Sequence, residues 1–378
     1  MDIWLIDILI TFGISVLLTG ILIPQILLIA FRKKLFDIPD ERKIHNIVVP
    51  RLGGFAFMPA IIFSMACVFG IELLSVGDTI GLFNLSHVVQ ICFIMCALVL
   101  MYLVGMADDL VGVRYVAKFV VQIVAAVFIV AAGLTLKNLN GFLWIDTIHP
   151  VAGFILTLLV IVFIINAINL IDGIDGLASG LSVIALLFYG IAFYSSGDLF
   201  FSMLSVAAIG TLVPFFYYNV FGDPGKRKKI LMGDTGALTI GVILSTLALK
   251  MAGMSISTMD NLPVNPVVVA FSPLIVPCID VVRVCFHRIL HRRNPFLPDK
   301  CHIHHKILAL GIPQHVTMIV ILIISAMFIT VNVLLSAFIN VTWLVLIDLL
   351  VWAVGNMLLT RAIHRREHRL GGDTKLYE

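Results

Sequence analysis

Charged side chains are scarce in this chain of 378 residues: Asp, Glu, Lys and Arg together make up 12% of it, whereas hydrophobic residues make up 61%. Soluble domains carry about 25% charged residues, so the composition excludes a soluble protein and predicts an integral membrane protein. No low-complexity segment, internal repeat or polar stretch of domain size separates the apolar runs. We therefore expect residues 1–378 to form a single transmembrane domain.

A basic region before the first apolar run is also lacking, and Asp2 and Asp7 stand there instead. Because a signal peptide begins with positive charge, the first run is expected to be an uncleaved membrane helix. Cysteine is sparse as well, and the six cysteines lie in or beside apolar runs. They indicate small buried hydrophobic residues and not a disulfide framework.

Apolar runs long enough to cross a membrane recur about eleven times, which predicts an all-α, polytopic fold. They lie near 3–31, 53–75, 87–106, 116–136, 150–168, 177–196, 200–218, 236–256, 265–287, 316–338 and 341–360. Lys and Arg gather in the loops after the first, third, seventh and ninth runs and in the C-terminal tail. By the positive-inside rule, the N-terminus is then outside and the C-terminus is in the cytoplasm. Topology and attraction to anionic membrane lipids explain most of these basic residues.

The stretch NAINLIDGIDGLASG, residues 166–180, directly follows an apolar run and carries Asn166, Asn169, Asp172 and Asp175 at intervals of three. On a helix or in a tight turn, this spacing points the four side chains roughly one way. A carboxylate inside a bilayer costs a few kcal/mol, so two carboxylates with two amides indicate a function. The structural alternative is a helix end capped by Asn or Asp and closed by a glycine turn. Capping accounts for one or two of these residues, not for all four.

Three further polar clusters lie on the same, cytoplasmic side of the predicted topology. Together with 166–180, the loops 107–118, 219–236 and 288–306 are expected to form the active site. Their polar residues are Asp108, Asp109 and Lys118, then Asn219 and Asp234, then Arg288, His302, His304 and His305. The shared side of these residues predicts one site at the cytoplasmic membrane surface.

Five carboxylates that converge would repel each other, since two like charges about 4 Å apart cost on the order of 4 kcal/mol at an effective dielectric near 20. A divalent cation offsets this repulsion. Mg²⁺ or Mn²⁺ is expected, because both prefer oxygen ligands and the carboxylates outnumber the nearby thiols. The turn at 233–236, GDTG, offers backbone N–H groups at a helix start to a phosphate.

The segment HIHH at 302–305 has three interpretations. A zinc site is disfavoured, because the helical His-x-x-x-His spacing and a nearby Glu are missing. Surface histidines in a basic loop are the structural alternative. Donors to a diphosphate or a sugar are favoured, since Arg288, Lys300 and Lys306 lie close in sequence.

These motifs together resemble the polyprenyl-phosphate N-acetylhexosamine-1-phosphate transferases, which belong to glycosyltransferase family 4. The similar segments span nearly the whole chain: PRLGG at 50–54, ADD at 107–109 with Lys118 and Gln122, residues 166–180, Asn219, MGDTG at 232–236 and HIHH at 302–305. The HIHH segment is similar to the branch that uses a UDP-N-acetylhexosamine and not to the branch that uses UDP-muramoyl-pentapeptide. The chain departs from the family pattern at Ala237, where many relatives have Ser, and in its basic loop at 222–229.

The resemblance implies a bacterial inner-membrane enzyme that transfers GlcNAc-1-phosphate from UDP-GlcNAc to undecaprenyl phosphate, releases UMP and uses Mg²⁺. This reaction is the first step of cell-surface glycan synthesis, such as that of O-antigen. The resemblance also implies a homodimer, and no nucleic-acid partner is expected. The identity of the amino sugar and of the downstream polymer stays open.

The resemblance also implies a role for each residue of the clusters. Asp234 is expected to be the leading metal ligand, helped by Asp109 or Asp172. Asp108 is expected to deprotonate or orient the acceptor phosphate, and Lys118 to neutralise phosphate charge. The nucleotide and the metal shell are assigned to Asn166, Asn169, Asp172, Asp175 and Asn219. The diphosphate or amino sugar is assigned to His302, His304 and His305, with Arg288, and the rim of the site to His45 and Arg51.

Two alternatives remain open from the residues. A covalent route through an aspartyl phosphate is a less favoured mechanism. An ion- or proton-coupled transporter is the rival class, because intramembrane carboxylates and glycine-broken helices also mark ion paths. Coupling carboxylates belong near the bilayer midplane, however, whereas the acids of this chain lie at helix ends on one side. A binding or scaffold protein leaves the convergence of acids and histidines unexplained.

Overall fold

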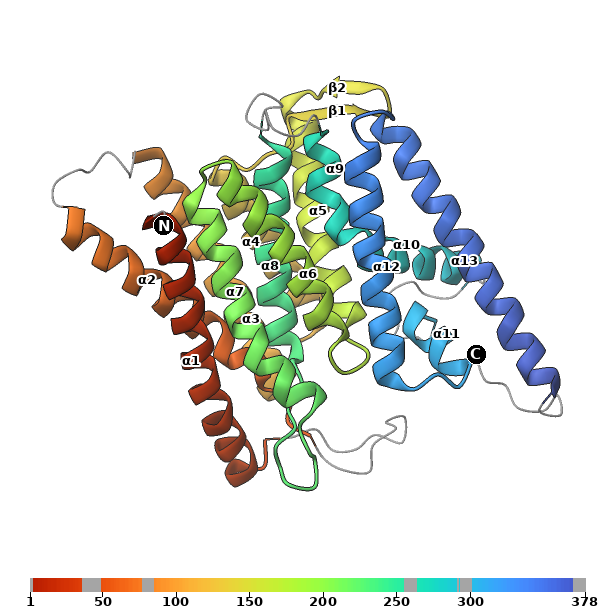
Figure 1. Cartoon of the computed structure of the whole chain (residues 1–378), viewed down its shortest axis with the longest axis horizontal. Helices are drawn as coiled ribbons and strands as arrows, with labels where there is room; N and C mark the ends of the chain where they lie inside the picture. Colours follow the sequence, from red (N-terminus) through yellow and green to blue (C-terminus); the bar gives the residue numbers. More distant parts are fainter. Residues whose placement is uncertain are drawn as a thin grey trace.

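The computed structural model describes residues 3–35, 49–76, 85–254, 264–290, 292 and 301–369, and it is a bundle of helices (Figure 1). Within these ranges, ten helical segments are long and apolar enough to cross a membrane, which confirms the all-α membrane fold. Nine of them are α1 (Ile3–Lys33), α2 (Phe57–Val76), α3 (Leu85–Val111), α5 (Pro150–Ile171), α6 (Leu177–Ser195), α7 (Leu199–Val220), α8 (Gly233–Ala252), α12 (Gln314–Leu335) and α13 (Val341–Arg369).

The tenth segment is broken, although the sequence predicts one continuous span at 265–287. It consists of α9 (Pro266–Phe271), the short 3₁₀ turn η4 (Ser272–Leu274) and α10 (Ile275–Leu290). Pro273 lies in the turn, where its ring prevents the preceding helix from continuing. As a result, α9 runs along the bundle and α10 turns sideways towards α13 (Figure 1).

The span predicted at 116–136 is shorter than expected. It is the apolar helix α4 (Tyr115–Ala131), whose 17 residues extend about 25 Å at a rise of about 1.5 Å per residue. The chain therefore leaves the helix several residues early and enters a hairpin that the sequence did not predict. Its strands are β1 (Asn138–Phe142) and β2 (Ile145–Thr147), which pair antiparallel.

Helix α8 is the centre of the bundle, packed against α3, α5, α6 and α7. Small residues such as Gly236, Ala237 and Gly241 let its neighbours approach closely. A Cβ on Gly241, for example, would lie 2.9 Å from the Cα of Ile165 on α5. The first turn of α8, which carries Asp234, is therefore held by a rigid environment.

The PRLGG segment at 50–54 packs directly on this first turn. The backbone of Leu231 donates to Pro50 O at 2.8 Å, and the N–H groups of Gly53 and Gly54 donate to Leu231 O and Met232 O, each at 2.9 Å. A Cβ on Gly54 would collide with the backbone of Gly236. This close approach explains why two glycines begin the short 3₁₀ helix η1 (Gly53–Ala56), which leads into α2.

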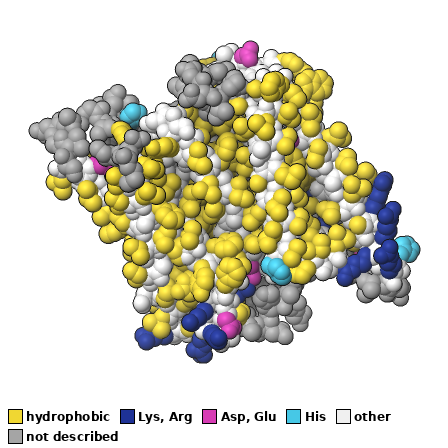
Figure 2. Space-filling view, viewed as in Figure 1, with side chains coloured by type: hydrophobic (Ala, Val, Ile, Leu, Met, Phe, Trp, Pro, Cys, Tyr) yellow, Lys and Arg dark blue, Asp and Glu magenta, His cyan; other side chains and the backbone are white. Residues whose placement is uncertain are grey.

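Hydrophobic side chains predominate over the middle of the visible face of the molecule (Figure 2), as expected of a surface that contacts lipid. Basic residues gather where α1 and α13 end, among them Arg32, Lys33, Arg366 and Arg369. The hairpin lies at the opposite end of α5 from Asp172, because α5 begins just after β2 and ends just before Asp172. The two ends of the bundle therefore differ in both charge and structure.

Candidate active site

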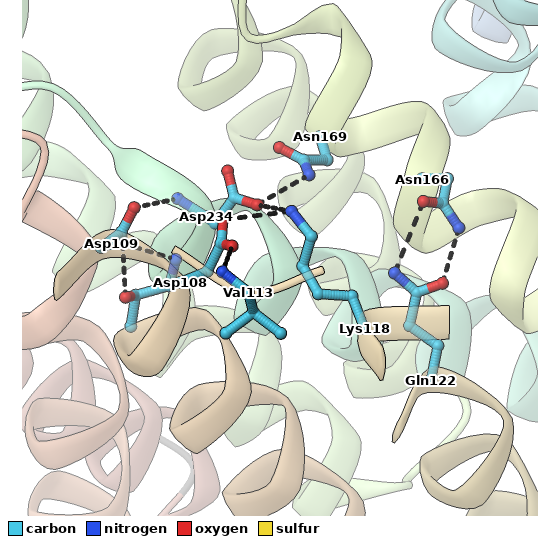
Figure 3. Close-up of polar contacts among 9 residues, drawn as sticks. Asp108, Asp109, Val113, Lys118, Gln122, Asn166, Asn169 and Asp234 are labelled. Carbon is cyan, nitrogen blue, oxygen red and sulfur yellow. Dashed lines mark hydrogen bonds and ion pairs between the residues drawn. The ribbon is translucent and has the colours of Figure 1, made fainter. Parts of the chain in front are cut away.

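Lys118, on α4, lies between two of the predicted carboxylates (Figure 3). Its Nζ atom is 2.6 Å from Asp234 Oδ2 and 3.1 Å from Asp108 Oδ2. Asp108 is also held by the backbone N–H of Val113, which donates to its Oδ1 at 2.6 Å. One ammonium group thus compensates two carboxylates that would otherwise repel each other.

Asp109 points away from this ammonium group and closes the start of α8 instead. Its Oδ1 accepts from Asp234 N at 2.8 Å, and its Oδ2 accepts from Thr235 N at 2.8 Å and from Thr235 Oγ1 at 2.5 Å. These are N–H groups of the first helical turn, which have no partner inside the helix. Asp109 therefore acts as a helix cap supplied by another helix, and it fixes the backbone of Asp234.

The last turns of α5 direct their two amides to different partners. Asn169 Nδ2 lies 3.5 Å from Asp234 Oδ2, at the edge of the carboxylate cluster. Asn166 Nδ2 donates to Gln122 Oε1 at 2.7 Å, and Gln122 Nε2 lies 3.4 Å from Asn166 Oδ1 (Figure 3). Asn166 therefore joins α5 to α4 through a half-buried amide pair, about one helical turn before Asn169.

The loop after α5 holds the other two predicted acids, because the helix ends at Ile171 and the interval of three does not continue as a helix. Asp172 is half-buried at the C-terminal end of α5. Asp175 binds Lys229, whose Nζ lies 2.5 Å from its Oδ2, and both side chains are largely buried. The four residues of the motif therefore share one region but do not point to a single atom.

Asn219, at the end of α7, fastens this loop to the start of the MGDTG segment. Its Oδ1 accepts from Gly176 N at 2.7 Å, and its Nδ2 donates to Ile230 O at 2.9 Å. Gly176 has a φ of +77°, a conformation that favours glycine, just before α6 begins. The amide of Asn219 thus sets the position of one loop relative to the other.

Asp172 lies within electrostatic range of the whole cluster. Burial, followed by the nearby charge of Asp175, raises its pKa to about 7, and the guanidinium of Arg51 acts in the opposite direction. The charges of Asp234 and Asp109 also raise this pKa. The carboxylates predicted from three separate segments therefore meet in one region, with Arg51 beside them.

The histidine motif packs against the same loop. His304 lies beside Gly173, where a Cβ would collide with its Nε2 atom. His304 is 1% exposed, and within the described part of the chain neither of its ring nitrogens has a hydrogen-bond partner. Burial and the neighbouring His305 lower the pKa of His304 to about 3, so the ring is neutral at neutral pH. A buried imidazole without a partner is unusual in a folded protein and marks His304 as a candidate ligand-binding residue.

The remaining predicted residues are placed as follows. His302 is buried at the start of α11 (Ile303–Ala309), His305 is half-buried on it, and Arg288 is buried on α10. His45 and Lys300 lie outside the described residues. The loop 288–306 is therefore described only at its two ends.

Three site residues were missed from the sequence. In the sequence, Lys229 is one of several lysines of a basic loop, whereas in the structure it is a largely buried partner of Asp175. Asp280 and Arg283 lie inside the apolar segment of α10. Asp280 contacts His302, and Arg283 contacts Asp280 and the carbonyl oxygen of Cys301, just before the histidine motif. A carboxylate within a membrane-spanning run is the signal that points to Asp280.

The donor set suits Mg²⁺ or Mn²⁺. Within the described ranges, no three Asp, Glu, His or Cys side chains are arranged to hold a metal ion by themselves. Mg²⁺ does not require such a cage, because it is commonly bound by one or two carboxylates together with water and substrate phosphates. Asp234, with Asp108 beside it, offers hard oxygen ligands of this kind at the mouth of a helix.

Comparison with known proteins agrees with this geometry. Residues 91–252, which include all five carboxylates, match the model of glycosyl transferase family 4. The chain is 31% identical over 351 residues to the probable undecaprenyl-phosphate N-acetylglucosaminyl 1-phosphate transferase of Bacillus subtilis, with 92% of this chain and 90% of the relative covered. It is 29% identical over 310 residues to the undecaprenyl-phosphate alpha-N-acetylglucosaminyl 1-phosphate transferase of Yersinia pestis, with 81% and 78% covered.

The corresponding enzyme of Escherichia coli K12 is 26% identical over 310 residues, with 81% of this chain and 78% of the relative covered. The alignments thus extend well beyond the carboxylate segments to most of the helical bundle. With this similarity over nine-tenths of its length, the chain belongs to glycosyl transferase family 4, as a membrane-embedded phosphoglycosyl transferase.

Proposed function

We propose that this enzyme transfers N-acetylhexosamine 1-phosphate, with GlcNAc as the expected sugar, from its UDP derivative to undecaprenyl phosphate and releases UMP. The observation that carries the proposal is the Lys118 ammonium between Asp108 and Asp234, at the end of the bundle where several helices start or stop. The names of the bacterial relatives support the acceptor and the sugar.

The reaction is a phosphoryl transfer between two anions. An oxygen of the lipid phosphate attacks the sugar-bound phosphorus of the UDP-sugar. The bond from that phosphorus to the bridging oxygen breaks, and UMP leaves with the bridging oxygen and its electron pair. Because phosphoryl transfer requires little covalent participation by the protein, positioning of the substrates and charge stabilisation supply most of the catalysis.

Each residue of the cluster has a role in this proposal. Lys118 turns from the carboxylates to neutralise phosphate oxygens, and Asp108 orients the acceptor phosphate or accepts its proton. Asp234 holds Mg²⁺, helped by Asp172. The main role of Asp109 is to fix the backbone of Asp234 through the cap on α8, and any contact of Asp109 with the metal is secondary to that role. When bound, Mg²⁺ offsets the negative charge that develops on the phosphate oxygens.

The donor side is assigned to the loop after α5 and to the histidine motif. Asn169 and Asp175 are assigned to the nucleotide, whereas Asn166 and Asn219 hold the neighbouring helix and loop in place through their amide contacts. The ring nitrogens of His304, which have no hydrogen-bond partner among the described residues, bind the diphosphate or the amino sugar together with His302, His305 and Arg288. The domain assignment follows: loops 107–118, 166–180, 219–236 and 288–306 form the site of one transmembrane domain.

The location of the site supports a position in the inner membrane with the active site facing the cytoplasm. Basic residues gather where α1 and α13 end, and by the positive-inside rule this charge favours a cytoplasmic location for that end of the bundle. UDP-sugars are water-soluble and the acceptor is a lipid, so a site at the helix ends is accessible to the donor from water and to the acceptor from the membrane. The homodimer stays a prediction.

Purified protein tests the proposal directly. With undecaprenyl phosphate, Mg²⁺ and UDP-GlcNAc, it is expected to release UMP and form a GlcNAc diphospholipid, and to do neither after chelation of the metal. UDP-GalNAc and UDP-glucose, run in parallel, identify the sugar. A product that carries a single phosphate, or no UMP release with any UDP-N-acetylhexosamine, rejects the proposal.

A further inference from the structure

The carboxylate of Asp280 lies in the interior of α10 and is fully buried. Its Oδ2 is 2.8 Å from His302 Nδ1, and its two oxygens each accept from Ile303 N at 3.2 Å. Arg283, one turn further along α10, donates from Nη2 to Asp280 Oδ1 at 3.0 Å. A buried carboxylate is costly unless it is paired in this way, so the arrangement has a specific use.

The same network also holds the chain that leads into the histidine motif. Arg283 Nη2 donates to the carbonyl oxygen of Cys301, the residue before His302. His302 provides no side-chain cap for α11, and Asp280 supplies that cap from a neighbouring helix through Ile303 N. Residues 301–303 are therefore fixed to α10 by three separate contacts.

The contact with Asp280 also orients the ring of His302. A carboxylate that accepts from Nδ1 selects the tautomer with the proton on Nδ1 and leaves Nε2 as the nitrogen that can meet a ligand. The His302 and His304 rings are nearly parallel, 6° apart in plane, with centroids 5.7 Å apart. The orientation of His302 is thereby passed on to His304, whose ring nitrogens have no partner in the described part of the chain.

We propose that Asp280, together with Arg283, is a positioning residue for binding of the UDP-sugar diphosphate: it fixes the tautomer and orientation of His302 and, through ring stacking, of His304. The proposal rests on the proposed function for the identity of the ligand. Asp280 acts through His302 and does not itself touch substrate, since its carboxylate is fully enclosed.

A double-mutant cycle tests this role. Asp280→Asn is expected to raise the KM for UDP-GlcNAc about tenfold and to leave the KM for lipid phosphate within about twofold, as loss of an outer-shell partner does elsewhere. His302→Ala is expected to have a similar effect. Because the two residues act in series, Asp280→Asn in the His302→Ala background is expected to add less than about twofold.

Asp348→Asn is the matched control, because Asp348 is also a buried carboxylate on a membrane-spanning helix, paired with Asn332 at 2.8 Å and remote from α11 in sequence. It is expected to leave the KM for UDP-GlcNAc unchanged. The proposal would be overturned if the effects of Asp280→Asn and His302→Ala on the KM for UDP-GlcNAc multiplied in the double variant. It would also be overturned if Asp280→Asn raised the KM values for UDP-GlcNAc and lipid phosphate equally, because Asp280 would then contribute only to general stability. If Asp280→Asn does not give folded protein, Asp280→Glu replaces it and is held to the same cycle.

A second readout does not depend on turnover. In protein labelled with ¹⁵N-histidine, His302 is expected to show the tautomer protonated at Nδ1, and Asp280→Asn is expected to shift that signal, whereas Asp348→Asn leaves it in place. If the wild-type protein released no UMP from any UDP-sugar but kept this signature, the proposed function would fail and the positioning contact would stand. A His302 signal insensitive to Asp280 overturns the inference, whatever the activity.

Discussion

Asp109 caps helix α8 at Thr235, although the two residues come from different helices and are separated by 126 positions in the chain. The neighbouring residue, Asp108, turns the other way and meets Lys118. The two adjacent carboxylates thus have different roles: Asp109 sets the position of the Asp234 backbone, and Asp108 faces the ammonium group of Lys118. This division explains why the ADD segment contains two acids in a membrane-spanning helix.

Substitution of the cap should therefore act through Asp234. Asp109→Asn removes charge from a contact with three donors, and we expect a fall in activity of about 10- to 100-fold, as for other outer-shell partners of a metal site. Thr235→Val removes only the hydroxyl donor and should have a smaller effect, a loss of about 1 kcal/mol in the stability of the capped helix. UMP release and the Mg²⁺ concentration for half-activation measure both. A neutral Thr235→Val beside a complete loss of metal activation in Asp109→Asn would make Asp109 a direct ligand.

Lys118 is expected to be the cation on which the cluster depends. In Lys118→Ala, Asp108 and Asp234 face each other without compensation, and the phosphates lose their nearest ammonium. We expect kcat to fall by about 10²- to 10³-fold, the range for removal of one charge-stabilising donor. Lys118→Arg should retain part of the activity. Lys137→Ala, at an exposed position near the hairpin, is the control and should behave as wild type.

Metal binding should depend on pH through Asp172. Its pKa is raised to about 7, chiefly by burial, so below pH 7 a cation must displace a proton to gain this ligand. The affinity for Mn²⁺ should therefore rise by about tenfold between pH 6 and pH 8, because the ionised fraction rises by that factor. Paramagnetic resonance of Mn²⁺ without substrates avoids titration of the lipid phosphate. If the Mn²⁺ affinity of Asp172→Asn depended on pH as strongly as that of the wild type, Asp172 would be excluded as the origin of the pH dependence.

The basic loop at 222–229 contains one lysine that differs from the rest. The Lys229 side chain is 10% exposed and its Nζ lies 2.5 Å from Asp175 Oδ2. The Lys226 side chain is 76% exposed, and its Nζ lies farther from its partner, at 3.9 Å from Asp223 Oδ2. Lys229→Met should leave a largely buried carboxylate without its partner and lower both activity and thermal stability, by about 1–3 kcal/mol for the lost charged hydrogen bond. Lys226→Met is the control, and similar losses in both variants would mean that net loop charge matters and not the pair.

The sequence was sufficient to predict the helical membrane architecture, and it selected acids that the structure brings close together; their role as an active site stays a prediction. Hydrophobic run lengths depend only on local composition, so nearly all spans were found, and the positions of acids at run ends predicted their convergence. The break at Pro273 and the hairpin at 138–147 were missed, since apolar composition does not distinguish a bent helix from a straight one. Partners such as Lys229 for Asp175 depend on how distant helices are docked, which periodicity does not report.

Glycine contacts provide the sharpest test of how the site is held together. Gly54 packs on Gly236 with no room for a Cβ, whereas no atom of the described residues lies within 4 Å of a Cβ built on Gly70 of α2. Gly54→Ala should therefore push the PRLGG segment away from the first turn of α8, lower the melting temperature in detergent and reduce kcat, with an overpacking cost of about 1–3 kcal/mol. Gly70→Ala should match wild type or gain slightly, because alanine favours the helix. If Gly54→Ala retained full activity and stability, the first turn of α8 would not depend on this contact, and the rigid placement of Asp234 would have to come from Asp109 and α3 alone.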